Sequence, residues 1–292
     1  MIKANKSLSI TINSQNNDIT WSEKWIGQGR QMSLCEIVRL DGYIQSTYLA
    51  VYPDKIMLLD GGCRADVPMV LNYIKTDLNR PVTDLKVVVV THMHPDHAGG
   101  AHQFRQKTGC LIVSADKKGQ WYGGIGGRTM HLVDINLAYY VARRQGRALK
   151  NLYFPARLKP DKTVKEGDCV PEFDEWQVLE TPGHTDRDLS LFHIPTRRVY
   201  TADLIIKLRH KFVAPFPVYD PMTYHQSLQK IKELNPSSVM MAHGQELTMN
   251  KDDFEQFIAQ APKRPRTIKD TIRHKLLWRR KGDRSSWFKR KP

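Results

Sequence analysis

Three histidines and one aspartate fall within six residues of a single segment, Thr91-His92-Met93-His94-Pro95-Asp96-His97-Ala98-Gly99-Gly100. The histidines lie at offsets of two and three, so they cannot form one helical stripe, and a loop is expected to hold them. Neutral imidazole nitrogen and carboxylate oxygen are the ligands that Zn²⁺ and similar divalent ions take in proteins. The segment therefore predicts a metal site rather than a solvated histidine-rich turn.

A strand is expected to position this loop. Residues 85–90 read Leu-Lys-Val-Val-Val-Val, a β-branched and apolar run that is typical of a buried strand. The four polar side chains follow directly where that strand ends.

The pattern H-x-H-x-D-H at the end of an apolar strand resembles the first metal motif of the metallo-β-lactamase superfamily. Further segments resemble the family's later motifs and occur in the family's order: Thr181-Pro182-Gly183-His184-Thr185, Thr201-Ala202-Asp203 and Ala242-His243-Gly244. Upstream, residues 46–51 and 55–62 resemble its opening hairpin. The resemblance covers about two thirds of the chain, and it implies an α/β fold, a four-layer αββα sandwich.

The resemblance also implies a dinuclear metal centre. His92, His94 and His184 would hold one ion, Asp96, His97 and His243 the second, and Asp203 would bridge both, with Asp96 also assigned a catalytic part. Two divalent ions, Zn or alternatively Mn or Fe, are expected. Asp60 would either orient a ligand through hydrogen bonds or simply form the turn before Gly61.

Hydrolysis is the reaction class that such a centre implies. Two neighbouring cations generate hydroxide at neutral pH and polarise the substrate oxygen, so a metal-bridging hydroxide would attack an ester, lactone or thioester without a serine or cysteine nucleophile. True β-lactamases of the superfamily generally lack the bridging aspartate, so Asp203 with a full set of histidines argues against β-lactam hydrolysis. Flavodiiron proteins have a glutamate at the second histidine of the first motif, and His94 excludes that pattern. Residues 219–224 look most like the lactonase-like branch, beside thioesterases that resemble glyoxalase II. The segment 186–188 departs from many relatives, which place a glycine there.

Two alternative functions share parts of this pattern. One is a nucleic-acid or phosphodiester hydrolase that grips phosphates with a basic tail, and the other is a mononuclear iron persulfide dioxygenase. If the protein instead hydrolyses an ester, lactone or thioester, the expected substrate is a small molecule.

Charge is concentrated at the carboxyl end of the chain. The net charge is +15, and residues 262–292 contain thirteen Lys or Arg and two Asp, which leaves +4 for residues 1–261. We expect one catalytic domain, 1–261, and a basic tail, 262–292. A basic appendage suits an anionic membrane surface or nucleic acid, although its apolar side could instead pack on the fold or on a second subunit.

Composition is consistent with a globular protein. Of the 292 residues 40% are hydrophobic, and no apolar run is long enough for a membrane span. No apolar stretch follows residues 1–6, so a secretory signal is not expected. The four scattered cysteines, Cys35, Cys63, Cys110 and Cys169, are typical of a reduced cytoplasmic protein, with peripheral membrane attachment as an alternative.

An insertion is expected at residues 119–165, where the family pattern stops. Its glycines, Gly123, Gly124, Gly126 and Gly127, lack phosphate-loop spacing and favour a flexible lid or turn before a helix at about 133–149. Elsewhere the apolar spacing predicts edge strands within 1–45, helices at 67–78, 101–108 and 224–234, and strands at 110–113, 176–180, 189–194, 198–201 and 239–241.

Overall fold

A computed structural model of the chain describes residues 5–13, 18–26, 35–208 and 211–267. Residues 209–210 and most of the predicted basic tail, from residue 268 onward, lie outside the described residues.

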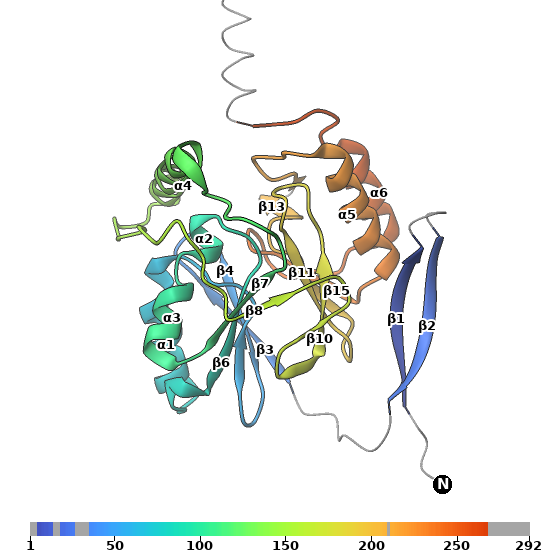
Figure 1. Cartoon of the computed structure of the whole chain (residues 1–292), viewed down its shortest axis with the longest axis horizontal. Coiled ribbons are helices and arrows are strands. Elements are labelled where there is room, and N and C mark those ends of the chain that lie inside the picture. The colour runs from blue at the N-terminus through green and yellow to red at the C-terminus, as the bar shows by residue number, and fades with distance from the viewer. Residues whose placement is uncertain (1–4, 14–17, 27–34, 209–210, 268–292) are drawn as a thin grey trace, which may run out of the picture.

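Two mixed sheets stacked face to face form the centre of the molecule (Figure 1). The first has the order β3-β4-β5-β6-β7-β8, with parallel pairing from β5 onward, and the second has the order β15-β12-β11-β10-β9. The strands of the first sheet are β3 (Glu36–Asp41), β4 (Ser46–Val51), β5 (Ile56–Leu58), β6 (Leu85–Val90), β7 (Leu111–Ala115) and β8 (Lys162–Val164). Those of the second are β9 (Cys169–Val170), β10 (Phe173–Glu180), β11 (Leu189–His193), β12 (Arg198–Tyr200) and β15 (Ser238–Met240).

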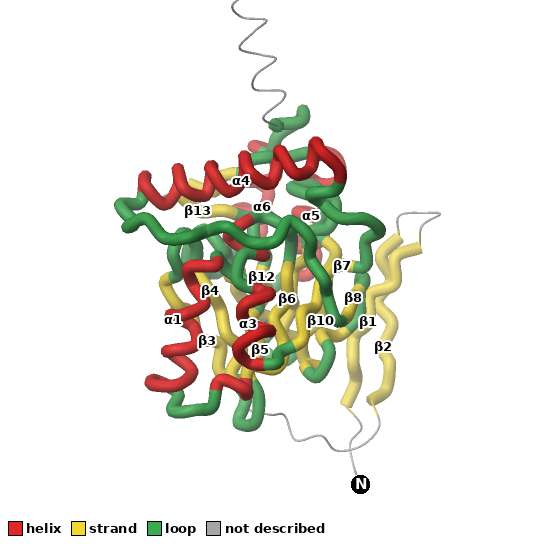
Figure 2. Tube along the Cα trace, turned by 60° about the vertical axis from the view of Figure 1, so that its left-hand side comes forward, coloured by secondary structure: helices red, strands yellow, loops and turns green. Residues whose placement is uncertain are grey.

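Helices cover the outer face of each sheet. On the first sheet lie α1 (Val67–Asn72), α2 (Pro95–Ala98) and α3 (Ala101–Thr108), and α4 (Gly124–Arg144) crosses the end of the molecule above them (Figure 2). On the second sheet lie α5 (Pro221–Leu234) and α6 (Lys251–Gln260). The predicted αββα layer order is confirmed. None of the helices in the described ranges combines the length and the apolar character that crossing a bilayer demands.

Burial on both faces explains the unbroken apolar run of β6. Val87 and Val89 belong to the cluster between the two sheets, whereas Val88 and Val90 belong to the cluster under the helices. A strand that is covered on both sides has no solvent face, so its sequence does not alternate. The position of β6 in the middle of the sheet places the residues that follow it in the interior.

Several predicted elements are confirmed with small shifts of boundary. Helix α3 ends where expected, with Gly109 in a left-handed conformation (φ 79°) after it. The helix expected at 67–78 is composite, with a 3-10 turn at Arg64–Asp66 before α1 and a π turn at Tyr73–Asp77 after it. The described residues also form two separate antiparallel pairs: β1 (Asn5–Asn13) with β2 (Asp18–Ile26), and β13 (Ile206–Leu208) with β14 (Lys211–Val213).

Two expectations need correction. Of the edge strands expected within 1–45, β3 forms one edge of the first sheet, whereas β1 and β2 pair with each other in a sheet of their own. Gly124, Gly126 and Gly127 form the first turn of α4 rather than a flexible lid. Glycine is required at position 127 because the chain packs too closely there for a side chain. A Cβ would lie 2.4 Å from the backbone carbonyl carbon of Tyr122.

Trp176 lies at the centre of the cluster between the sheets and is fully buried. Replacing it by alanine is expected to lower the free energy of unfolding by about 3–5 kcal/mol, because a large cavity would open between two rigid layers. Chemical denaturation measures this change. The matched variant Tyr140→Ala, at a side chain that is 60% exposed, should change it by less than about 0.5 kcal/mol, and equal losses in both variants would contradict the packing described.

Candidate metal centre

The loop after β6 and helix α2 carry four of the seven predicted ligands. His92 and His94 lie in the loop, as expected. Asp96 and His97 lie instead in α2, a single helical turn that begins at Pro95. Proline at the first helical position is favourable because its missing N–H has no partner there in any case. The backbone of Gly61 crosses close to this turn, where a Cβ would lie 2.5 Å from the carbonyl oxygen of His97.

The other three predicted ligands come from the second sheet. His184 follows β10, Asp203 follows β12 and His243 follows β15. Both β10 and β12 are antiparallel to β11, and β12 is parallel to β15, so these three strands run in the same direction. Their carboxyl ends therefore meet at one edge of the sheet, next to α2.

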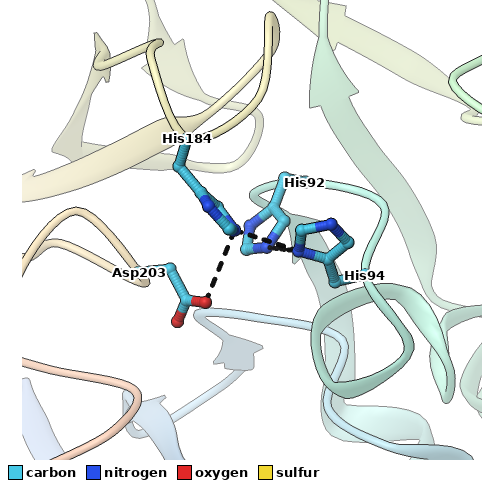
Figure 3. Close-up of side chains that lie close together, drawn as sticks. All are labelled: His92, His94, His184 and Asp203. Carbon is cyan, nitrogen blue, oxygen red and sulfur yellow. Dashed lines mark hydrogen bonds and ion pairs between the residues drawn. The ribbon is translucent and has the colours of Figure 1, made fainter. Parts of the chain in front are cut away.

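His92, His94, His184 and Asp203 form one buried group (Figure 3). Nδ1 of His94 lies 3.1 Å from Nε2 of His92 and 2.9 Å from Nε2 of His184. One oxygen of Asp203 lies 3.5 Å from Nε2 of His184. Three ring nitrogens and a carboxylate thus converge on one point, which is the donor set of a tetrahedral zinc site.

Asp96, His97 and His243 form the second group. The Asp96 carboxylate lies 3.1 Å from Nε2 of His243 and 3.8 Å from Nε2 of His97. The other oxygen of Asp203 lies 3.2 Å from Nε2 of His97 and 3.5 Å from Nε2 of His243. Asp203 therefore presents one oxygen to each group, which is the arrangement expected of a bridging carboxylate.

Hydrogen bonds on the outer side of three rings fix which nitrogen faces inward. Nδ1 of His184 donates to the carbonyl of Pro217 at 2.6 Å, and Nδ1 of His97 donates to the Asp60 carboxylate at 2.6 Å. Nδ1 of His92 lies 3.2 Å from the Thr91 hydroxyl, which itself donates to Asp60. Each Nε2 is therefore free to offer its lone pair to a cation.

Nε2 of His97 and Oδ1 of Asp203 face each other at 3.2 Å, but neither atom forms a hydrogen bond with a described residue. Both are buried, and buried polar atoms without partners are rare because they lose their hydration without compensation. A bound cation would satisfy both. The seven residues thus form a His/Asp cluster that fits two divalent ions.

The charges of the two groups differ. Burial and the neighbouring imidazoles lower the pKa of His92. Burial, with a smaller contribution from the neighbouring His184 ring, lowers the pKa of His94 to about 3. Both imidazoles are therefore neutral at pH 7. Burial also opposes charge on His97, but the carboxylates of Asp203, Asp60 and Asp96 outweigh it and raise the pKa of His97. The second group therefore favours positive charge between its carboxylates.

Asp60 orients this centre. Its carboxylate accepts from the Thr91 hydroxyl at 2.8 Å, the His97 ring at 2.6 Å and the Tyr200 hydroxyl at 3.1 Å, and also from the backbone N–H groups of Gly61 and Thr91. Of the two expectations for this residue, the geometry favours the orienting role over a plain turn.

Sequence reasoning missed a carboxylate that comes from the insertion. Asp134 on α4 lies 3.9 Å from Nε2 of His94, on the side of the ring away from the cluster, and accepts a hydrogen bond from the Tyr122 hydroxyl at 2.8 Å. Burial raises the pKa of Asp134 to about 6. The signal was present in the sequence, since Asp134 is the one acidic residue between 119 and 160.

Other histidines lie outside this cluster. His102 is half-buried on α3, His131 packs against Tyr122 and Phe154, and His193 lies in β11 beside Thr196. All four cysteines are free. Burial raises the pKa of Cys63 far above its ordinary value, so this thiol stays protonated and is no nucleophile.

Comparison with known proteins agrees with this arrangement. The model of the metallo-beta-lactamase superfamily matches residues 40–243, which include all seven cluster residues. The chain belongs to this superfamily. The matched range begins in β3 and includes both sheets and the insertion.

Individual relatives in the superfamily are distant. The probable metallo-hydrolase YqjP of Bacillus subtilis is 24% identical over 213 residues, which cover 67% of this chain and 66% of YqjP, slightly less than two thirds of its length. A hydroxyacylglutathione hydrolase of Bradyrhizobium is 26% identical over 167 residues, 57% of this chain and 51% of that protein. The structure of the metallo-beta-lactamase family protein TTHA1429 from Thermus thermophilus superimposes with a TM-score of 0.56 at 16% identity, covering 85% of this chain and 83% of that one.

Replacing Asp203 by alanine is expected to lower the metal content of the purified protein from about two ions per chain to about one or fewer, because both groups lose a shared ligand. Elemental analysis of protein prepared with excess Zn²⁺ measures this. His102→Ala removes a histidine outside the cluster and should leave the content unchanged. An Asp203→Ala protein that keeps the full content would show that the carboxylate does not bridge.

Replacing Asp134 by asparagine is expected to weaken metal affinity by roughly 10- to 100-fold, since a carboxylate beside a ligating imidazole raises its basicity and fixes its orientation. Competition against a chromogenic chelator gives the affinity. Asn136→Asp alters an exposed position of the same helix and serves as the control. If the metal affinity of Asp134→Asn is unchanged, the carboxylate of Asp134 packs beside His94 without influencing metal binding.

Proposed function

We propose that this protein is a dinuclear metallohydrolase that cleaves an ester, lactone or thioester. The observation that carries the proposal is the position of Asp203, with one oxygen facing the His92, His94 and His184 group and the other facing the Asp96, His97 and His243 group. One carboxylate between two such groups suits two cations that act together.

The residues divide the task in a way that follows from their contacts. The first group offers three imidazoles, of which His92 and His94 have lowered pKa values, and it would hold its ion mainly through nitrogen. The second group combines Asp96 with two histidines, and Asp60 holds His97 in place from behind. When bound, two divalent cations would lower the pKa of a water and polarise the substrate oxygen. No serine or thiol nucleophile is required, in agreement with the protonated state of Cys63.

A small cavity of about 60 Å³ lies beside His92 and offers room for a few atoms of a substrate. Lys117, Gln120 and Arg187 contribute polar groups to its lining, and Leu158 and Ala115 contribute apolar ones. Arg187 is held there by its contacts with the carbonyl of Gly119 and the ring of Trp121. This mixture suits the acyl part of a small ester or thioester that carries a polar group.

Similarity to a hydroxyacylglutathione hydrolase supports a thioester among these substrates. The matched region is about half of that protein's length, so the similarity favours the reaction class and does not identify a substrate. Cytoplasmic location is part of the same proposal, since four free cysteines suit a reducing compartment.

A substrate panel with metal removal tests the proposal. Protein loaded with Zn²⁺, Mn²⁺ or Fe²⁺ is assayed with a hydroxyacyl thioester, an acyl homoserine lactone, an aryl ester, an aryl phosphodiester and a glutathione persulfide. We expect hydrolysis of at least one of the first three substrates, loss of that activity on dialysis against a chelator and recovery when metal returns.

Two results would overturn the assignment. Turnover of the phosphodiester alone would favour the nuclease-type alternative, and oxygen consumption with the persulfide in a protein that holds one iron would favour the dioxygenase.

A further inference from the structure

The insertion carries an excess of positive charge that the metal centre does not use. Residues 119–160 contain seven Lys or Arg, and their one acidic residue, Asp134, is buried. The rest of the body up to residue 261 has a net charge of −2. On α4, Arg128, Arg143 and Arg144 are exposed and form no ion pair with any described residue. The charge is therefore available to an external partner.

Apolar side chains accompany these arginines on the outer side of α4. Ile125 is 88% exposed, Leu132 is 55% exposed and Tyr140 is 60% exposed. Their spacings of seven and eight residues, about two helical turns, place them on the same side of the helix. The opposite side is buried through His131, Asp134, Ile135, Ala138 and Ala142. The six outward residues, which we call the α4 surface, are Ile125, Arg128, Leu132, Tyr140, Arg143 and Arg144.

Helix α4 lies along one end of the molecule (Figure 2). Asp134 on its inner side lies beside His94, so the helix separates the metal centre from the α4 surface. Whatever binds this surface would lie directly over the centre.

We propose that the α4 surface docks onto an anionic membrane. Arginines attract acidic lipid headgroups, and aliphatic and tyrosine side chains between them enter the boundary between headgroups and acyl chains. A nucleic acid would use the arginines but would give Ile125 and Leu132 no apolar environment, because its affinity rests on phosphate contacts. Exposed aliphatic side chains among arginines that pair with no described carboxylate thus favour a lipid surface.

Vesicle co-sedimentation of the full chain tests this proposal. The probes are vesicles of phosphatidylcholine alone and vesicles that also contain phosphatidylserine. The informative variant is Ile125→Ser with Leu132→Ser, which removes apolar surface and leaves every charge, including those of the basic tail, unchanged. The matched control is Ile194→Ser, 38% exposed just after β11.

We expect the full chain to bind the anionic vesicles and not the neutral ones. The double serine variant should bind with an affinity at least about tenfold lower, because two side chains can no longer enter the interface, and the control should bind like the unmodified chain. Circular dichroism checks that the variants are folded, and bound metal need not be present.

Three outcomes would overturn the proposal. Equal binding of the double serine variant and the unmodified chain would place membrane attachment elsewhere. Absence of binding to anionic vesicles would exclude it. If Arg128→Glu with Arg143→Glu abolished binding to an oligonucleotide while the serine variant kept its affinity for vesicles, the surface would be a nucleic-acid site.

Discussion

The hydrogen bond between Asp60 and His97 is the interaction on which the geometry of the centre depends. One carboxylate at the end of β5 receives donors from the loop after β6, from α2 and from Tyr200 of β12. It therefore joins both sheets at the level of the ligands. Because the Asp60 side chain is buried, each of these bonds acts in a medium of low dielectric constant, where the loss of one donor would disturb the others.

This arrangement also explains the close packing of glycine around α2. Gly61 follows Asp60 directly, and the N–H of Gly100 donates to the carbonyl of Gly62. A side chain at Gly61 or Gly100 would collide with backbone atoms of the opposite segment, in both cases at 2.5 Å. The two glycine pairs thus allow β5 and α2 to approach closely enough for the Asp60 carboxylate to reach His97.

The sequence was sufficient to predict the layers and the grouping of the seven His and Asp residues, because its motifs resemble, in type and order, those of one superfamily with this fold. It was not sufficient where a contact depends on a segment outside the motifs. Asp134 reaches His94 only because α4 crosses over α2, and no local spacing encodes that crossing. The start of α4 was also missed, since glycines that signal a turn in isolation can equally be selected for close backbone contact, as at Gly127.

The division of the centre between the two sheets has a consequence for how the chain folds. His97 and Asp203 are separated by more than a hundred residues in the sequence, yet they meet at 3.2 Å. Contacts between such distant residues form late, because a long loop must close before they gain any energy. Each sheet can begin to form separately, but the centre exists only after the sheets have docked. An ion that binds it would therefore bind the native state far better than the unfolded chain, and the supply of metal would shift the folding equilibrium.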